Sequence, residues 1–164
     1  MTKTPKPTFT RPLPSLSLYA EEEVLAYSLS ILETKLRGAG EIMSSPTLIK
    51  TYLRTLLQET PYEVFGVILL DAQNRLMHCE EMFRGTLSQT AVYPREVVTL
   101  ALKRNAAGIV FFHNHPSGLA EPSHADQLLT SALKQALALV DVKVLDHFIV
   151  GGYNVLSFAE RGLL

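Results

Sequence analysis

The residues Ile109-Val110-Phe111-Phe112-His113-Asn114-His115-Pro116-Ser117-Gly118 carry a short apolar run directly into a polar segment. The apolar residues predict a buried strand, and Pro116 with Gly118 predicts a loop after it. His113 and His115 stand two positions apart at this junction. On an extended backbone such residues project from one face about 6.5–7 Å apart, so their imidazoles can converge on one ion, while the residue between them points the other way. Because the chain has five histidines, this spacing also arises by chance, and the pair alone is a weak signal.

A third ligand has to come from another element, and the segment after the histidines offers one. Ser123 and Asp126 open a long helix whose apolar residues recur at helical spacing up to Val140. A carboxylate binds zinc at about 2.0–2.2 Å, so Asp126 can complete the set. The competing interpretation is a capping box, in which Ser123 caps backbone N–H groups and Asp126 reaches back. The two interpretations conflict, because a carboxylate bound to a metal cannot fully serve as the reciprocal cap.

The chain on either side of this region predicts a sheet with helices. The apolar run Val64–Leu70 and the extended stretch 75–83 flank a short polar turn and predict a hairpin. A helix opens at Pro94, and residues 142–150 and 154–158 predict two further strands. We expect an α+β or α/β fold with a mixed sheet flanked by helices. Its first strand should pair beside the strand that leads to the histidines.

The first sixty residues divide into an arm and two helices. Residues 1–20 hold four of the nine prolines and little apolar content, which predicts a flexible arm. Glu21–Gly38 begins with three glutamates and predicts a helix, and Ser44-Ser45-Pro46 predicts the capped start of a second one. We therefore expect a helical extension at 21–59 and one domain at 60–164. The stripes expected to be buried are Val24, Tyr27 or Ser28, Ile31 and Leu36 in the first helix, and Val97, Val98, Ala101 and Leu102 in the third.

Composition restricts the class of protein. The chain has 164 residues, 47% of them apolar, which suits one ordinary domain with a core. Its 15 Lys and Arg against 16 Asp and Glu leave a net charge of -1, which argues against binding nucleic acid or anionic lipid mainly through bulk charge. We expect the single cysteine, Cys79, to be a packing residue. One cysteine excludes an internal disulfide and the cysteine-rich zinc site of a nucleobase deaminase. No apolar run approaches the ~20 residues of a membrane span and no secretory signal is present, so we expect a cytoplasmic protein without membrane contact.

Two imidazoles and one carboxylate leave one position of a tetrahedral zinc site open for water, which is typical of catalytic sites. Hydrolysis at such a site also needs a base for the proton of that water. The candidate bases are Glu63, Glu80, Glu81 and Glu96. Glu63 stands at the entrance of the first strand. Glu96 can simply satisfy a helix dipole, and one of Glu80 and Glu81 should be solvated because neighbours on a strand point to opposite faces.

The order and spacing of these residues resemble a known metalloprotease motif. His113-x-His115-Pro116, then seven residues between His115 and Ser123, then Ser123-x-x-Asp126, resembles the JAMM motif of the MPN+ or JAB-domain superfamily. Around it, the sequence is similar to the bacterial RadC-like family over roughly residues 60–164. The segments that carry this resemblance are Phe83-Arg84-Gly85-Thr86, Tyr93-Pro94-Arg95-Glu96, His113-Asn114-His115-Pro116-Ser117-Gly118, Glu121-Pro122-Ser123, Leu145-Asp146-His147 and Ser157-Phe158-Ala159-Glu160-Arg161-Gly162.

The resemblance implies a single JAB/MPN-like domain, similar in fold to cytidine deaminases, with Zn2+ bound by His113, His115 and Asp126. It places the general base on Glu63, in the setting Glu63-Val64-Phe65-Gly66, and implies that Ser123 helps to hold the tetrahedral oxyanion. The implied reaction is attack of zinc-activated water on an amide or isopeptide carbonyl of a peptide or protein substrate. Glu63 would take the proton and return it to the leaving amine.

The resemblance also brings an alternative function. Longer members of the family carry a helix-hairpin-helix-like region before this domain, and we expect here a short form with two short helices. The alternative is a DNA-repair-associated accessory or DNA-binding module whose metal site is structural or vestigial. The basic residues considered for a DNA contact are Arg84, Arg95, Lys103 and Arg104. We expect them to form a solvated rim, and we expect His147 to orient a ligand or serve the core rather than bind metal. The natural substrate and the oligomeric state are left open.

Overall fold

The structure, a computed structural model, describes residues 20–38, 46–85 and 92–164. The helices and strands in these ranges are α1 (Glu21–Gly38), α2 (Pro46–Leu57), β1 (Val64–Leu70), β2 (Leu76–Arg84), α3 (Pro94–Lys103), β3 (Gly108–Asn114), α4 (His124–Ala138), β4 (Lys143–Gly151) and β5 (Asn154–Ser157). Of the predictions above, the arm at 1–20, except for Ala20, and the cap at Ser44-Ser45 fall outside the described residues. In the described ranges, no helix combines the length and the hydropathy that a membrane span requires.

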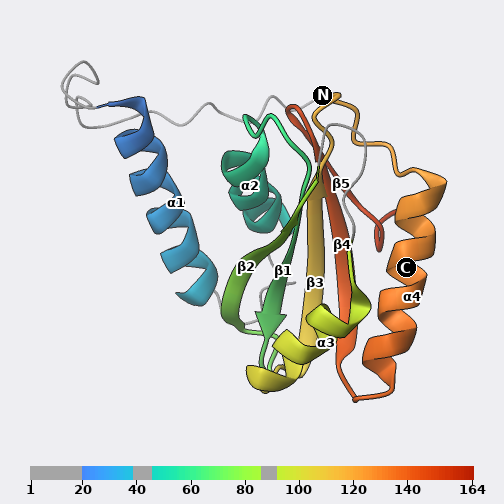
Figure 1. Cartoon of the computed structure of the whole chain (residues 1–164). Helices are drawn as coiled ribbons and strands as arrows, with labels where there is room; N and C mark the ends of the chain where they lie inside the picture. The colour runs from blue at the N-terminus through green and yellow to red at the C-terminus, as the bar shows by residue number, and fades with distance from the viewer. Residues whose placement is uncertain (1–19, 39–45, 86–91) are drawn as a thin grey trace, which may run out of the picture.

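One five-stranded sheet runs through the middle of the domain in the order β2-β1-β3-β4-β5 (Figure 1). β3 and β4 are parallel and are connected through α4, whereas the other neighbouring strands are antiparallel. The sheet is therefore mixed, as the sequence predicts, and β1 lies next to β3. Helices α1 and α2 pack on one side of the sheet, and α3 and α4 pack on the other.

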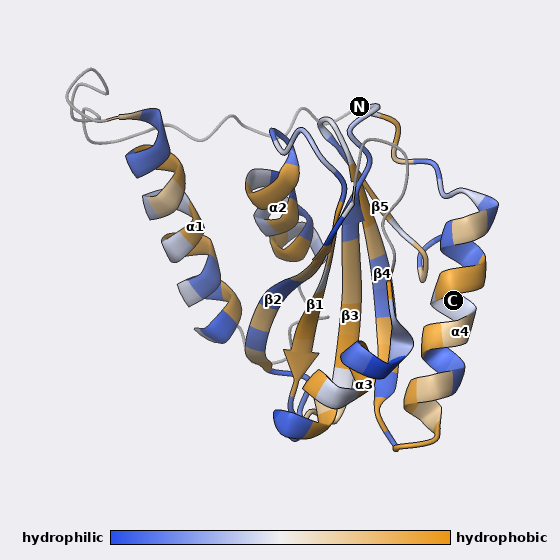
Figure 2. Cartoon of the chain, viewed as in Figure 1, coloured by the Kyte–Doolittle hydropathy of each residue, from blue (hydrophilic) through white to orange (hydrophobic). Residues whose placement is uncertain are grey.

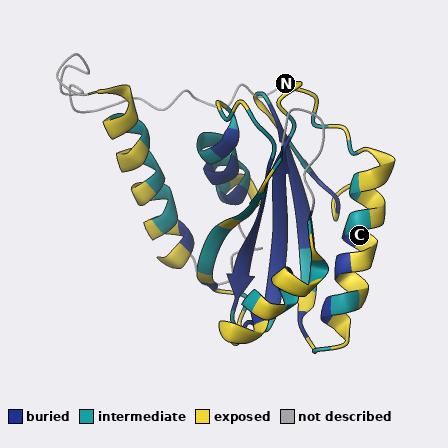
Figure 3. Cartoon of the chain, viewed as in Figure 1, coloured by how far each residue is buried: buried dark blue, intermediate teal, exposed yellow. Residues whose placement is uncertain are grey.

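Strands β1 and β3 are buried along their whole length. Every residue of β1 and β3 is buried, as expected for strands that helices cover on both faces. Successive residues point to opposite sides. Ile68 and Phe112 face α1 and α2, whereas Val67 and Phe111 face α3 and α4. Figure 2 shows the resulting hydrophobic strands between amphipathic helices, and Figure 3 shows that burial is concentrated in the same layer.

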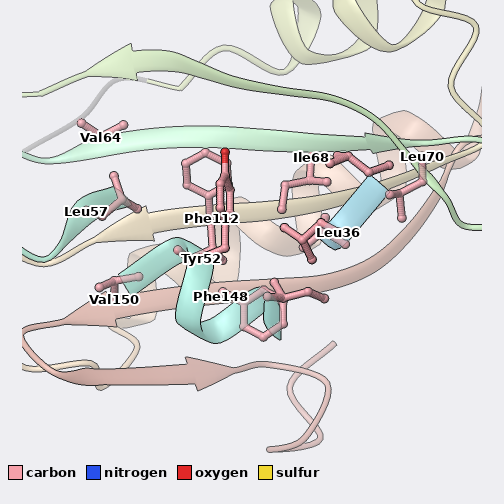
Figure 4. Packing of buried hydrophobic residues seen from close by; sticks show 13 residues of the cluster. Leu36, Tyr52, Leu57, Val64, Ile68, Leu70, Phe112, Phe148 and Val150 are labelled. Carbon is pink, nitrogen blue, oxygen red and sulfur yellow. The ribbon is translucent and has the colours of Figure 1, made fainter. Parts of the chain in front are cut away.

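Helix α2 shares a hydrophobic core with the sheet (Figure 4). Tyr52 and Leu57 of α2 lie in one cluster with Phe112 of β3 and Phe148 of β4, and Leu36 joins this cluster from α1. The cluster packs α2 directly against the strands that lead to the histidines. The domain boundary placed at residue 60 stays a prediction.

The buried face of α1 differs from the expected stripe. Tyr27 is 70% exposed and Ile31 is 39% exposed, while Leu29 and Leu32 pack with Leu36 against the core. Helix α1 has apolar residues on more than one side, so its contacts with α2 and β2 select the face that is buried.

Two further details also differ from expectation. Strand β3 continues to Asn114, so His113 and Asn114 belong to the strand and pair with Ile149 and Val150 of β4 rather than starting a loop. Leu102 is 55% exposed, because it lies about 100° around α3 from Ala101 and therefore off the buried stripe that Val97 and Ala101 form.

Candidate metal centre

His113, His115 and Asp126 come together where β3 ends and α4 begins. His113 is the next-to-last residue of β3, and His115 directly follows the strand. Asp126 lies in the first turn of α4. One ligand atom from each residue lies within 4.8 Å of the other two. The histidine pair and the carboxylate that the sequence singled out therefore form one cluster, with His113 buried and the other two partly buried.

The turn after β3 sets the position of His115. Its backbone N–H donates to the carbonyl of Val150 at 2.8 Å. After Pro116, Gly118 adopts a φ of 81°, a region that favours glycine, and its N–H donates to the His115 carbonyl at 3.0 Å. The chain then presents the carbonyl of Leu119, which lies 2.8 Å from His115 Nδ1. Because a carbonyl only accepts, His115 Nδ1 carries a hydrogen and donates it.

The ligand atoms face one another closely. In neutral His115 the lone pair is on Nε2, which lies 2.9 Å from Nε2 of His113. Asp126 Oδ1 lies 3.3 Å from His113 Nε2, and Asp126 Oδ2 lies 3.5 Å from His115 Nε2. Lone pairs that converge at these distances repel unless a proton or a cation lies between them. Two imidazole nitrogens and a carboxylate oxygen are ligands that zinc and other first-row transition metals accept, so the residues fit a metal ion.

Asp126 also caps its own helix. Its Oδ2 accepts from the backbone N–H of Ser123 at 2.7 Å and from the Ser123 hydroxyl at 2.6 Å, and the Asp126 N–H donates to Ser123 Oγ at 3.2 Å. This is a complete capping box. In this geometry Oδ2 serves the cap while Oδ1 faces His113, so the capping box and the cluster occur together. That a bound metal ion would weaken the cap stays a prediction.

The cluster favours the ionised form of Asp126. Burial raises the pKa of Asp126, but hydrogen bonds with His113 and His115 outweigh burial and hold this pKa far below its usual range. The hydrogen bond with Asp126 raises the pKa of His115, against desolvation, which lowers it. A carboxylate that stays charged beside two imidazoles creates a negative site of the kind that attracts a divalent cation.

Glu63 lies at the edge of this cluster. It comes two residues before Phe65, which pairs with His113, and its own carbonyl accepts from the Gly85 N–H at 2.8 Å. Its side chain is partly buried, and its negative charge contributes to the raised pKa of His115. The carboxylate is thus near enough to act on His115, although it is not one of the three clustered ligands. Its role as a base stays a prediction.

The other three candidate bases have partners of their own on the surface. Glu80 pairs with His78 at 2.8 Å, Glu81 with Arg84 at 3.2 Å, and Glu96 with Arg95 at 3.3 Å. All three glutamates keep part of their side chains in contact with solvent, as expected for a hydrated surface. Glu63 is therefore the best placed of the four acids.

Sequence reasoning missed two buried polar residues beside the cluster. Asn114 and Thr130 are each 2% exposed. Asn114 hydrogen-bonds the segment ahead of β1, and Thr130 hydrogen-bonds His147, whose Nε2 lies 2.8 Å from Nδ1 of His113. His147 therefore contacts His113, one of the candidate ligands. That it orients a metal ligand stays a prediction. The one sequence signal for Thr130 is its place four residues after Asp126, on the same face of the helix.

A cavity of about 220 Å³ lies beside His115. Its wall includes the last residue of α2 with residues 58–61 after it, the turn that contains Pro116 and Gly118, and Val150 and Gly152 on the β4 side. The metal cluster therefore borders an indentation on the side of the turn that faces α2.

Comparison with known proteins identifies the family. A family model described as the RadC-like JAB domain matches residues 43–163. A UPF0758 protein of Janthinobacterium sp. (strain Marseille) is 62% identical over 125 residues, which are 76% of this chain and 56% of that protein. Another, from Aromatoleum aromaticum, is 55% identical over 151 residues, 91% of this chain and 67% of that protein. The chain thus spans a little over half the length of several curated relatives, including a UPF0758 protein of Nitrosomonas eutropha that is 61% identical over 126 residues and 56% covered. The chain belongs to the RadC-like JAB-domain family.

Proposed function

We propose that the protein is a zinc-dependent hydrolase that cleaves an amide bond, either in a peptide or in an isopeptide linkage. The observation that carries this proposal is the convergence of His113 Nε2, His115 Nε2 and Asp126 Oδ1. Three protein ligands of this kind leave a fourth position of a tetrahedral site open, as in catalytic zinc sites. Membership of a JAB-domain family is compatible with this chemistry.

Different residues would bind the metal ion, transfer the proton and stabilise the oxyanion. His113, His115 and Asp126 would hold the zinc ion, which would supply Lewis acidity and a water whose pKa is lowered towards about 7. Glu63 accepts the proton from the attacking water and later returns it to the leaving amine. Ser123 donates to the oxyanion that develops on the substrate carbonyl. Its hydroxyl donates to Asp126 in the structure, so this role requires the hydroxyl hydrogen to turn away from Asp126 by rotation about the Cβ–Oγ bond.

The first experiment is the zinc content of the purified protein after zinc loading and dialysis, measured by elemental mass spectrometry. We expect about one zinc per chain in the wild type, and none in Asp126→Ala or His115→Ala. The matched control is Ser123→Gly, which removes the capping hydroxyl but no ligand and should retain zinc. A wild type that retains no zinc would remove the basis for the hydrolase proposal.

The second experiment separates metal binding from turnover. A panel of fluorogenic peptides and isopeptide-linked conjugates is offered to the zinc-loaded protein. Glu63→Gln should keep zinc and lose hydrolysis by about 100-fold or more, because the amide cannot accept the proton. Glu22→Gln, an exposed position in α1, is the matched control. Full activity in Glu63→Gln would take the base role away from Glu63.

The alternative role, a DNA-associated accessory module, has less support. The guanidinium carbons of Arg84 and Arg95 lie 5.4 and 5.2 Å from the ring centroids of Tyr62 and Tyr93, a combination that single-strand binding surfaces use. Each arginine is also paired with a glutamate, which offsets the positive charge that phosphate binding requires. Titration of labelled duplex and single-stranded DNA at several salt concentrations tests this role. Binding tighter than micromolar at physiological salt would favour it.

A further inference from the structure

A chain of three hydrogen bonds connects the backbone of Asp126 with the ring of His113. Thr130 Oγ1 lies 2.6 Å from the carbonyl oxygen of Asp126 and 2.7 Å from Nδ1 of His147. His147 Nε2 in turn lies 2.8 Å from Nδ1 of His113. Thr130, His147 and His113 are each at most 2% exposed, so these groups satisfy one another without solvent.

The direction of every bond in this chain follows from its first member. A carbonyl only accepts, so the single hydroxyl hydrogen of Thr130 is donated to Asp126. The hydroxyl oxygen is then left to accept, and His147 Nδ1 must carry the hydrogen that it receives. In a neutral imidazole the other nitrogen is an acceptor, so His147 Nε2 receives a hydrogen from His113 Nδ1. The lone pair of a neutral His113 is consequently on Nε2, the atom that faces His115 and Asp126.

The surroundings of His147 keep its ring neutral. The rings of Phe65, Phe111 and Phe158 lie against it, with centroid distances of 5.8, 5.7 and 4.7 Å. The ring is fully buried, and an enclosure of this kind without water disfavours the charged imidazolium.

We propose that Thr130 and His147 are positioning residues that fix the proton of His113 on Nδ1 and so keep Nε2 available to the metal ion. The proposal rests on the metal centre proposed above. Under this proposal the Thr130 hydroxyl determines which ring nitrogen of His113 carries the hydrogen, and it acts through two hydrogen bonds, one between Thr130 and His147 and one between His147 and His113. The opposite pattern would set the bare Nδ1 of His113 against the bare Nε2 of His147 at 2.8 Å and would place a hydrogen where the metal ion binds.

The hydrogen positions can be measured without any metal. Long-range ¹H–¹⁵N correlation spectra of the metal-free protein, labelled on histidine nitrogen, distinguish a protonated from a bare ring nitrogen. We expect wild-type His113 and His147 to carry their hydrogens on Nδ1. Thr130→Ser keeps the hydroxyl and should keep this pattern, whereas Thr130→Val has the same shape without the hydroxyl and should shift His147 and His113 towards mixed forms. A wild-type His113 with a bare Nδ1, or a Thr130→Val spectrum identical to that of the wild type, would overturn the proposal.

Zinc affinity is the second readout, measured by competition with a chromophoric chelator. We expect Thr130→Val to bind zinc about 10–100-fold more weakly than the wild type and Thr130→Ser to stay within about threefold. Melting curves of the metal-free variants establish that both fold. Equal affinity in a folded Thr130→Val protein would overturn the positioning role while leaving the metal centre in place. If the wild type itself binds no zinc, the metal centre fails and the spectra alone decide the protonation pattern.

Discussion

Asn114 holds the backbone on both sides of Glu63. Its Oδ1 accepts from the N–H of Val64 at 2.8 Å, and its Nδ2 donates to the carbonyls of Tyr62 at 3.0 Å and Thr60 at 3.3 Å. Asn114 stands between the two clustered histidines and points to the opposite face of β3. One short segment therefore carries two candidate ligands on one face and, on the other, the side chain that holds the backbone around the proposed base.

The first prediction concerns this clamp. In Asn114→Asp, a carboxylate oxygen replaces the amide nitrogen and faces two carbonyls that lose their donor. Because unsatisfied buried groups are costly, we expect the free energy of unfolding to fall by about 2–4 kcal/mol, as measured by urea denaturation. Zinc content should stay at the wild-type level, since the ligands lie on the other face. An unchanged midpoint of unfolding would contradict the clamp.

The second prediction concerns Gly66, which allows β1 to pass close to a ring of the next strand. A Cβ on Gly66 would lie 2.2 Å from Cζ of Phe112 and 2.7 Å from the backbone carbonyl oxygen of Glu80. Gly66→Ala should therefore lower the free energy of unfolding by at least about 2 kcal/mol. Phe112→Leu in the same chain should recover only part of the loss, because the carbonyl of Glu80 remains in the way.

The matched control for Gly66 is Gly38, the last residue of α1, where an added Cβ meets nothing within 4 Å. Gly38→Ala should leave the stability within about 1 kcal/mol of the wild type and on the stabilising side. A Gly66→Ala protein as stable as the Gly38→Ala protein would show that β1 and β3 can separate to admit the methyl group.

Much of the fold could be predicted because its central strands carry unambiguous patterns. Val64–Leu70 and the run that leads to His113 are apolar without interruption, which is typical of strands covered on both sides. The amphipathic face of α1 could not be predicted in the same way. Val24, Tyr27 and Ile31 form as regular a stripe as Leu29, Leu32 and Leu36, and only the packing against α2 and β2 distinguishes the two.

The candidate site also has residues that the sequence could indicate and residues that only the packing reveals. The spacing of His113 and His115 made them candidates, while the residues alone left Asp126 open between a ligand and a helix cap. The resemblance to the JAMM motif supplied the full set, and the structure brings the three side chains together. The contact between Thr130 and His147 depends on how α4 is rotated above the sheet and on the register that sets His147 opposite Phe111. Neither quantity follows from local spacing, so the hydrogen-bond chain behind His113 was visible only in the structure.

The third prediction separates the two roles of Ser123, which caps α4 and is proposed to hold the oxyanion. Ser123→Ala should lower the free energy of unfolding by about 1 kcal/mol, whereas Ser123→Gly should cost only a few tenths, because glycine tolerates the N-cap backbone. Both variants lack the hydroxyl, so both should lose turnover by about 100-fold or more. Turnover that follows stability instead, with the glycine variant near the wild type, would leave Ser123 with the capping role alone.

The fourth prediction concerns Asp146, a buried carboxyl that ties β5 and the following turn to β4. Its Oδ1 accepts from the backbone N–H groups of His147 at 2.7 Å and Ala159 at 2.9 Å, and its Oδ2 accepts from the Ser157 hydroxyl at 2.5 Å. Asp146→Ala leaves these donors unpaired and should lower the free energy of unfolding by about 2–4 kcal/mol. Asp146→Asn keeps one acceptor oxygen for the two backbone donors and should cost less, as measured by urea denaturation.

The same carboxyl predicts how the difference between wild type and Asp146→Asn depends on pH. Burial raises the pKa of Asp146 above its ordinary value of 3.8, although hydrogen bonds from Ser157, Ala159 and His147 act in the other direction. The folded chain then binds this proton more tightly than the unfolded chain. The stability that protonated Asp146 contributes is therefore full below the pKa of the unfolded chain, and it is lost as the pH rises through the pKa of the folded chain. Unfolding curves from about pH 3.5 to about pH 7 should therefore shift in favour of the asparagine variant as the pH rises. A shift in favour of the wild type would show that the three donors hold the ionised carboxylate better than water does.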